Sequence, residues 1–155
     1  MRPAGRRDKE ICRMKVKQLS LFIENKPGTL NEVCQALKKH NINISTLSLA
    51  DTEQFGIVRL LIRDWENAKR ILESIGLVVN VTEVLALPVD DHPGGLASLL
   101  EILARNNVNI EYMYAFSYGK ADKAIMVFRF EDTDKALEAL AGKNIDIIKS
   151  IDLFS

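Results

Sequence analysis

The chain has 155 residues, of which 47% are hydrophobic and 27% charged, the composition of an ordinary soluble globular protein with enough length for one core or two small ones. Because 21 basic residues balance 21 acidic ones, the charge gives no reason to expect nucleic acid or an anionic membrane as the main partner. No apolar run approaches the roughly 18 residues of a membrane span, and no secretory signal opens the chain, so we expect a cytoplasmic protein.

The amino-terminal stretch differs from everything that follows. Residues 1–13 hold five basic and two acidic residues and almost nothing apolar, which predicts a disordered tail over residues 1–14. A nucleic-acid-binding arm and a leader ahead of a start at Met14 are the alternatives. Cys12 lies in this tail and Cys34 in a predicted helix, so the two cysteines match neither a disulfide framework nor a metal cluster.

From residue 17 the hydrophobic pattern switches between the two-residue period of strands and the three-to-four-residue period of helices. Leu19, Leu21 and Ile23 alternate with Gln18 and Ser20, as in a strand with one buried face. Residues 44–50 and 55–62 are rich in strand formers, and the turn-prone segment 51–54 joins them. Between the first two strands lies a helical stripe of residues three and four apart, Leu30, Val33, Cys34 and Leu37.

A second helix and a last strand complete this first unit. Asp64 is a good N-cap residue for the helix, and Gly76 is a natural stop for it. Residues 77–81 supply the closing strand, so the unit reads strand, helix, strand, strand, helix, strand. The predicted inward face of the second helix consists of Ala68, Ile71, Leu72 and Ile75.

The same order of elements then repeats. The turn Asn25-Lys26-Pro27-Gly28-Thr29-Leu30 recurs 66 residues later as Asp91-His92-Pro93-Gly94-Gly95-Leu96. A hairpin turn that is two residues longer, around residues 119–122, then changes the offset to 68. Gly142 ends the last helix, and residues 145–154 supply the closing strand. Duplication of one unit explains this agreement.

Two such units predict an α+β protein. We expect two ferredoxin-like βαββαβ sandwiches, each with a four-stranded antiparallel sheet and two helices on one face. The predicted domains cover residues 15–82 and 83–155. Residues 78–89 are nearly unbroken strand formers, so the last strand of the first domain should run into the first strand of the second.

The repeated residues resemble a known family, the ACT domain, a small module that binds amino acids and regulates amino-acid metabolic enzymes. The resemblance rests on the turn Asn25-x-Pro27-Gly28-x-Leu30, the helix after it and the junction Asn41-Ile42-Asn43-Ile44. It extends over residues 17–154 as a tandem pair with no catalytic domain attached. It implies a non-catalytic regulatory protein that binds a free amino acid, needs no cofactor and forms a homodimer.

The resemblance also implies two ligand sites, because paired domains in this family hold a ligand at their interface. Each site would join the turn of one domain to the first helix–strand junction of the other. One site would consist of Asn25, Lys26, Gly28, Thr29 and Leu30 with Asn109 and Ile110. The other would consist of Asp91, His92, Gly94, Gly95 and Leu96 with Asn43 and Ile44.

The residue types of the first turn suit a zwitterion. A helix that begins just after the turn presents unpaired amides at Gly28, Thr29 and Leu30, together with the positive end of its dipole, to a carboxylate. The Asn25 side chain can accept from an ammonium and donate to a carboxylate. In the second turn Asp91 would repel a carboxylate, so we expect the first turn to be the better site.

Several features have simpler explanations. A Pro-Gly pair after a strand is often only a turn, and a metal at residues 90–92 would lack partner ligands. His40 at a helix end is better suited to binding free carbonyls than to catalysis. An alternating aromatic stripe serves sheet packing, a pocket or a dimer face, and consists of Tyr112, Tyr114, Phe116 and Tyr118.

Three other classes of function are alternatives to a free-standing amino-acid sensor. An enzyme is disfavoured, because the sequence has no nucleophile triad, phosphate loop or paired-carboxylate spacing. An RNA-binding domain would need basic neighbours around the aromatic stripe, which are absent. A regulatory subunit of a separate enzyme, of the acetolactate synthase type, remains open beside a free-standing amino-acid sensor.

Overall fold

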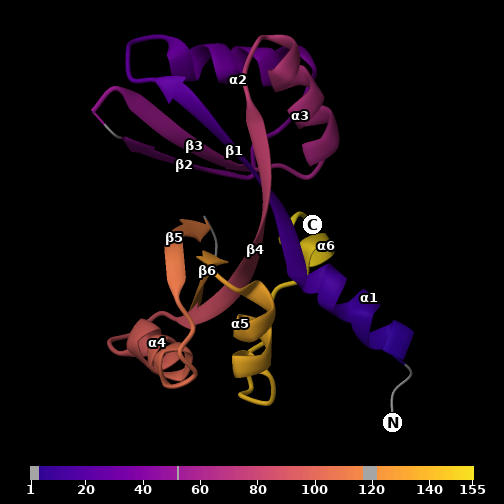
Figure 1. Cartoon of the computed structure of the whole chain (residues 1–155), viewed down its shortest axis with the longest axis vertical. Helices are drawn as coiled ribbons and strands as arrows, with labels where there is room; N and C mark the ends of the chain where they lie inside the picture. The colour runs from indigo at the N-terminus through magenta and orange to yellow at the C-terminus, as the bar shows by residue number, and fades with distance from the viewer. Residues whose placement is uncertain (1–3, 52, 117–121) are drawn as a thin grey trace. The chain divides into compact units, whose positions relative to one another are not determined.

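The computed structural model describes residues 4–51, 53–116 and 122–155. The chain divides into a first unit, Lys17–Thr82, and a second unit, Met1–Val16 with Glu83–Ser155. The described residues form the helices and strands drawn in Figure 1. Their bounds are α1 Ala4–Met14, β1 Lys15–Glu24, α2 Thr29–Lys39, β2 Thr46–Asp51, β3 Phe55–Leu61, α3 Trp65–Ser74, β4 Val79–Asp90, α4 Gly95–Arg105, β5 Ile110–Phe116, β6 Lys123–Phe130, α5 Thr133–Leu140 and α6 Ser150–Leu153.

In the first unit, α2 and α3 cover one face of an antiparallel sheet with strand order β2-β3-β1-β4 (Figure 1). Leu19 lies opposite Leu60 and Leu21 opposite Val58, and all four side chains are fully buried. Every second residue of a strand points to the face that the helices cover. The side chains on this face are therefore buried against the apolar sides of α2 and α3. The core consists of Leu19, Leu21, Ile23, Val33, Leu37, Val58, Leu60, Ile62, Ala68, Leu72 and Val79.

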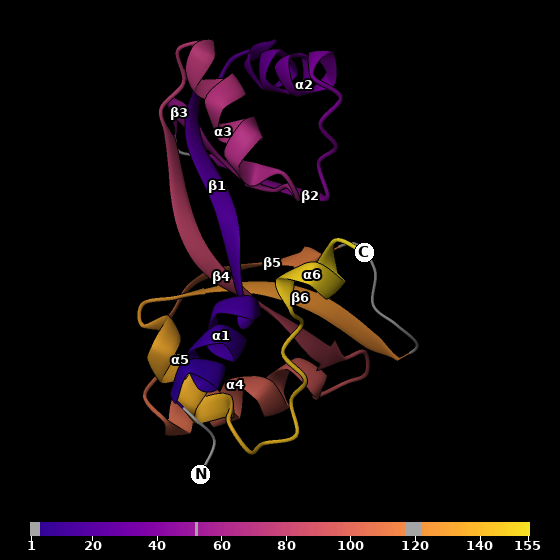
Figure 2. The same cartoon turned by 90° about the vertical axis from the view of Figure 1, so that its right-hand side faces the viewer.

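The second unit repeats this plan with strand order β4-β6-β5, and α4 and α5 lie on the same side of these strands (Figure 2). Leu85 is opposite Phe128, whose ring stacks on that of Phe130 with centroids 5.7 Å apart. The core consists of Leu85, Leu87, Val89, Leu99, Leu103, Val108, Phe128, Phe130, Ala136, Ala139 and Leu140. The predicted α+β class is therefore confirmed, and the first unit has the full βαββαβ order.

The number of strands differs from the prediction. The expected strands at residues 77–81 and 84–89 are one continuous strand, β4, as the run of strand formers indicated. The expected closing strand at residues 145–154 is wrong: its only pairing in the described chain is a single bridge from Ile148 to Ala86, and α6 follows. Ile145 and Ile147 pack against the core, so burial rather than strand pairing holds this segment.

The expected disordered tail is also wrong from residue 4 onward. Residues Ala4–Met14 form helix α1, with Ile11 and Met14 half-buried. The helix packs against α6 within the second unit. Its partner comes from the far end of the chain, so the local composition gave no sign of it.

The helix ends follow the predicted chemistry with two exceptions, at Asp64 and Ile75. Gly76 and Gly142, at positive φ of 91° and 72°, follow α3 and α5. Asp132 caps α5 by accepting from the Lys135 amide at 3.0 Å, whereas Asp64 stands at the N-cap of α3 without a side-chain bond. Ile75 was expected to point inward, but α3 ends at Ser74 and 49% of the Ile75 surface is exposed.

Tyr112, Tyr114 and Phe116 are half-buried on β5. Tyr118, Thr52 and most of the predicted turn at 119–122 lie outside the described residues. Within the described ranges, no helix has the length and apolarity needed to cross a bilayer.

Candidate functional site

The first turn joins β1 to α2 and is fixed by backbone hydrogen bonds and by the Thr29 side chain. The Asn25 amide donates to the Gln54 carbonyl at 3.0 Å, which ties the turn to the loop before β3. Gly28 is the N-cap of α2 with φ of 93°, a conformation that favours glycine, and its carbonyl accepts from Glu32 at 3.0 Å. The start of α2 is therefore set where the sequence predicted it.

The Thr29 hydroxyl is part of this turn. It donates toward the carbonyl oxygens of Glu24 at 2.7 Å and Lys26 at 3.0 Å, which closes the loop between strand and helix. The Lys26 ammonium pairs with the Glu24 carboxylate at 2.6 Å, and the hydrogen bond from this pair raises the pKa of Lys26. A ligand at this turn would meet one cation and one anion side by side, as a zwitterion requires.

The second turn is built differently. Gly94 repeats the positive φ of Gly28, at 88°, but Gly95 replaces Thr29 and lies so close to β4 that an added Cβ would be 1.9 Å from the Asp90 carbonyl oxygen. The strand carbonyl thus approaches α4 directly, without a bridging hydroxyl. The Asp91 amide donates to the Asp122 carbonyl at 2.7 Å.

A charged cluster lies beside the second turn. Lys123 donates to Asp90 at 2.6 Å, and this hydrogen bond lowers the pKa of Asp90 and raises that of Lys123. His92 Nε2 is 3.7 Å from the other carboxylate oxygen of Asp90, and its Nδ1 lies 3.0 Å from the Pro93 carbonyl. Asp91 itself is exposed.

The recurring asparagine junctions have a structural role that the sequence reading did not separate from ligand binding. Asn41 and Asn107, two residues past the ends of α2 and α4, have positive φ of 56° and 53°, which asparagine tolerates better than most residues. Asn109 donates to Glu131 at 3.3 Å, while Asn43 is exposed. The side chains of Leu30, Leu96, Ile44 and Ile110 pack against the two cores.

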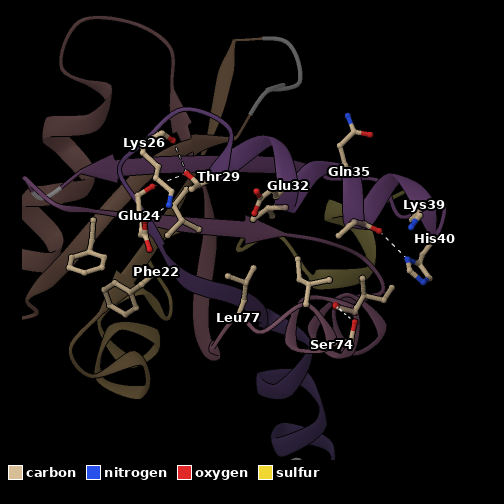
Figure 3. A pocket seen from close by; sticks show the side chains of 16 residues that line it. Phe22, Glu24, Lys26, Thr29, Glu32, Gln35, Lys39, His40, Ser74 and Leu77 are labelled. Atoms are coloured by element: carbon tan, nitrogen blue, oxygen red, sulfur yellow. Dashed lines mark hydrogen bonds and ion pairs between the residues drawn. The ribbon is translucent and has the colours of Figure 1, made fainter.

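A pocket of about 750 Å³ in the first unit runs along α2 (Figure 3). Of the residues predicted for the first site, it includes Lys26 and Thr29 but not Asn25, Gly28 or Leu30. Its polar lining consists of Glu24, Lys26, Thr29, Glu32, Gln35, Lys39, His40 and Ser74. Its apolar lining consists of Phe22, Ile23, Val33, Ala36, Phe55, Ile71, Ile75 and Leu77.

The two kinds of lining residue are not mixed evenly. Glu24, Lys26 and Thr29 gather at one end of the pocket, and Lys39 and His40 lie at the other (Figure 3). The His40 ring bonds the Ala36 carbonyl at 3.0 Å, as expected for a histidine at a helix end. The end formed by Glu24, Lys26 and Thr29 can hold the charged groups of a ligand, and Leu77 lies between this end and the end formed by Lys39 and His40 (Figure 3).

Most of the apolar lining was missed at the sequence level. Phe22 breaks the alternation of β1 by standing on the side opposite Leu21 and Ile23, with 56% of its surface exposed. A phenylalanine at an outward-facing strand position was the one sequence signal for an apolar pocket lining on β1. Ile75 and Leu77 follow α3, and nothing local shows that they reach α2.

Residues 4–51, 53–116 and 122–155 can be searched for metal-ligand clusters. No group of three or more His, Cys, Asp or Glu side chains is arranged there to hold an ion. Cys12 is exposed and Cys34 half-buried, and both are free thiols.

The chain belongs to the ACT domain family, since the family profile described as an ACT domain pair matches residues 14–155. A solved relative is protein BT0572 from Bacteroides thetaiotaomicron, 39% identical over 92% of this chain and 97% of that one, with a TM-score of 0.84. The ligand-free regulatory subunit of aspartate kinase from Thermus thermophilus is 18% identical and shares the fold, with a TM-score of 0.59 over 82% of this chain and 91% of that one.

Curated relatives are similar over shorter spans. The acetolactate synthase small subunit of Buchnera aphidicola is 28% identical over 83 residues, which is 51% of this chain and 52% of that protein. The acetolactate synthase small subunit of Mycolicibacterium smegmatis is 24% identical over 125 residues, or 79% of this chain and 68% of that protein. The chain thus spans about half the length of the first and about two thirds of the second.

Proposed function

We propose that this ACT-domain regulatory protein is non-catalytic and binds a free amino acid at the turn between β1 and α2. The observation that carries the proposal is the pocket beside this turn, where Lys26, Glu24 and Thr29 meet next to the start of α2. The Lys26 ammonium and the first helix amides would hold the carboxylate of the ligand. The Glu24 carboxylate would hold its ammonium, which requires the Glu24–Lys26 pair to open toward the ligand.

The pairing of this turn with Asn109 and Ile110, implied by the family resemblance, belongs to the proposal, as does the weaker site at Asp91. We place the two ACT domains at residues 15–82 and 83–155, and we expect a homodimer. The ligand would then shift the equilibrium between two conformations of the regulatory protein, because it binds one conformation more tightly than the other. The coupling free energy is typically on the order of 1–3 kcal/mol.

A thermal-shift screen of the full chain against the standard amino acids tests the proposal. A ligand present at about 100 times its dissociation constant should stabilise the protein by roughly 2.7 kcal/mol. The variant Lys26→Met should weaken binding roughly tenfold, because it removes a hydrogen bond to a charged group. Lys38→Met is the matched control, since Lys38 is an exposed lysine on α2, the helix that follows the turn, and lies outside the pocket lining.

Absence of any shift would reject amino-acid binding. A shift that both lysine variants leave intact would reject the placement of the ligand at this turn. The variant Asn109→Ala tests the contribution of the second domain in the same assay.

A second candidate function is supported by the two acetolactate synthase small subunits among the relatives. The protein would then act mainly by contacting the catalytic chain of an amino-acid biosynthetic enzyme. Co-elution with a purified acetolactate synthase catalytic subunit, and a change in its activity on mixing, would support this function. Separate elution with unchanged activity would reject it.

A further inference from the structure

The pocket along α2 extends beyond the charged end that the proposed function uses. Past Thr29, one side of the pocket is apolar and comes from three segments: Val33 on α2, Ile71 on α3, and Ile75 with Leu77 after α3. The polar lining residues past Thr29 are Glu32, Gln35, Lys39, His40 and Ser74, and the Ser74 hydroxyl is already bonded to the Ile71 carbonyl. Val33 and Ile71 are buried, with 1% and 7% of their surfaces exposed, so this part of the wall is held by the core. The part of the wall formed by Val33 and Ile71 is therefore a fixed surface, whereas Ile75 is 49% exposed and Leu77 is half-buried.

The positions of the charges set the direction of a bound zwitterion. With its charged groups at Glu24 and Lys26, the side chain of an amino acid would extend along α2 toward Leu77, which lies between the two ends of the pocket (Figure 3). An apolar side chain would exchange water for contact with this wall. A polar side chain of the same shape lying on this wall would lose water without gaining a hydrogen-bond partner from the apolar residues that form it.

We propose, on the basis of the proposed function, that the pocket along α2 selects amino acids with apolar side chains. A pocket of about 750 Å³ exceeds the needs of any standard side chain, so size does not set the limit. Selection follows apolar area, and affinity should rise about fourfold for each added side-chain methylene.

Titration calorimetry with the full chain tests the selection. Alanine, 2-aminobutyrate, norvaline and norleucine form a series that grows by one methylene, and about fourfold tighter binding is expected at each step. Valine and threonine have nearly the same shape, so valine should bind more tightly by about tenfold. Equal affinity for valine and threonine, or a flat series, would overturn the inference.

Two variants connect the selection to this wall. Ile75→Lys introduces a charge at an exposed pocket position and should weaken norleucine binding about tenfold while changing alanine binding little. Val78→Lys is the matched control, because Val78 is an exposed apolar residue three positions later and outside the pocket lining. An identical loss in both variants, or none in Ile75→Lys, would overturn the inference.

The outcomes separate the two proposals. If no amino acid binds, the proposed function fails and this inference fails with it. If amino acids bind without regard to side-chain polarity, only the apolar selection is rejected.

Discussion

Replacing Gly95 by alanine should destabilise the protein far more than replacing its neighbour Gly94. A Cβ at Gly95 would lie 1.9 Å from the carbonyl oxygen of Asp90 and 2.8 Å from its carbonyl carbon. Both atoms belong to the backbone of β4, so α4 must move away from the strand. Overpacking of this kind costs about 3 kcal/mol, at the upper end of the usual range.

At Gly94 nothing lies within 4 Å of an added Cβ, and only the positive φ of 88° opposes alanine. That conformation costs about 1 kcal/mol. The difference of about 2 kcal/mol between the variants corresponds to roughly 4–8 °C in melting temperature for a chain of this size.

Urea unfolding followed by circular dichroism measures the comparison, with Gly28→Ala as a further control. Gly28 also has open space around it and a φ of 93°, so its variant should behave like Gly94→Ala. Equal losses in Gly94→Ala and Gly95→Ala, with unchanged denaturant slopes, would refute the close approach of α4 to β4.

Three further predictions concern single interactions. Thr29→Val should lose about 1 kcal/mol of unfolding free energy in the same assay, because the hydroxyl that donates to two turn carbonyls is removed, and Thr29→Ser should restore most of it. Asp132→Ala should lose about 1 kcal/mol and Asp64→Ala clearly less, because only Asp132 makes a side-chain cap bond; equal losses would contradict this reading. Lys123→Met should be less stable than the natural protein near pH 6, and the difference should shrink as the pH falls below about 4, because the lowered pKa of Asp90 stabilises the fold only while its carboxylate is ionised.

The fold was predictable because its signals are local and occur twice. Each signal depends on residues close together in the chain: the strand period, the turn, the helix stripe and the glycine after a helix. Because the unit occurs twice, each signal in the first unit could be compared with its counterpart in the second. The starts of α2 and α4 were therefore predicted closely.

The ends of the chain were not predictable in this way. The composition of α1 is that of a polar tail, and its helix packs against α6. The last residues of the chain alternate as in a strand, but they pair with β4 only at Ile148. In both cases a partner distant in sequence decided the conformation, and propensity did not.

For the candidate site, the sequence by itself determined the turn: Pro27 and Gly28 fix the end of β1 and the start of α2 through backbone geometry alone. Only the tertiary structure decided what lies beside that turn. One pocket is lined by Phe22, Ile75 and Leu77, because packing brings β1, α2 and the end of α3 together. No periodicity in the sequence predicts that these three segments lie side by side.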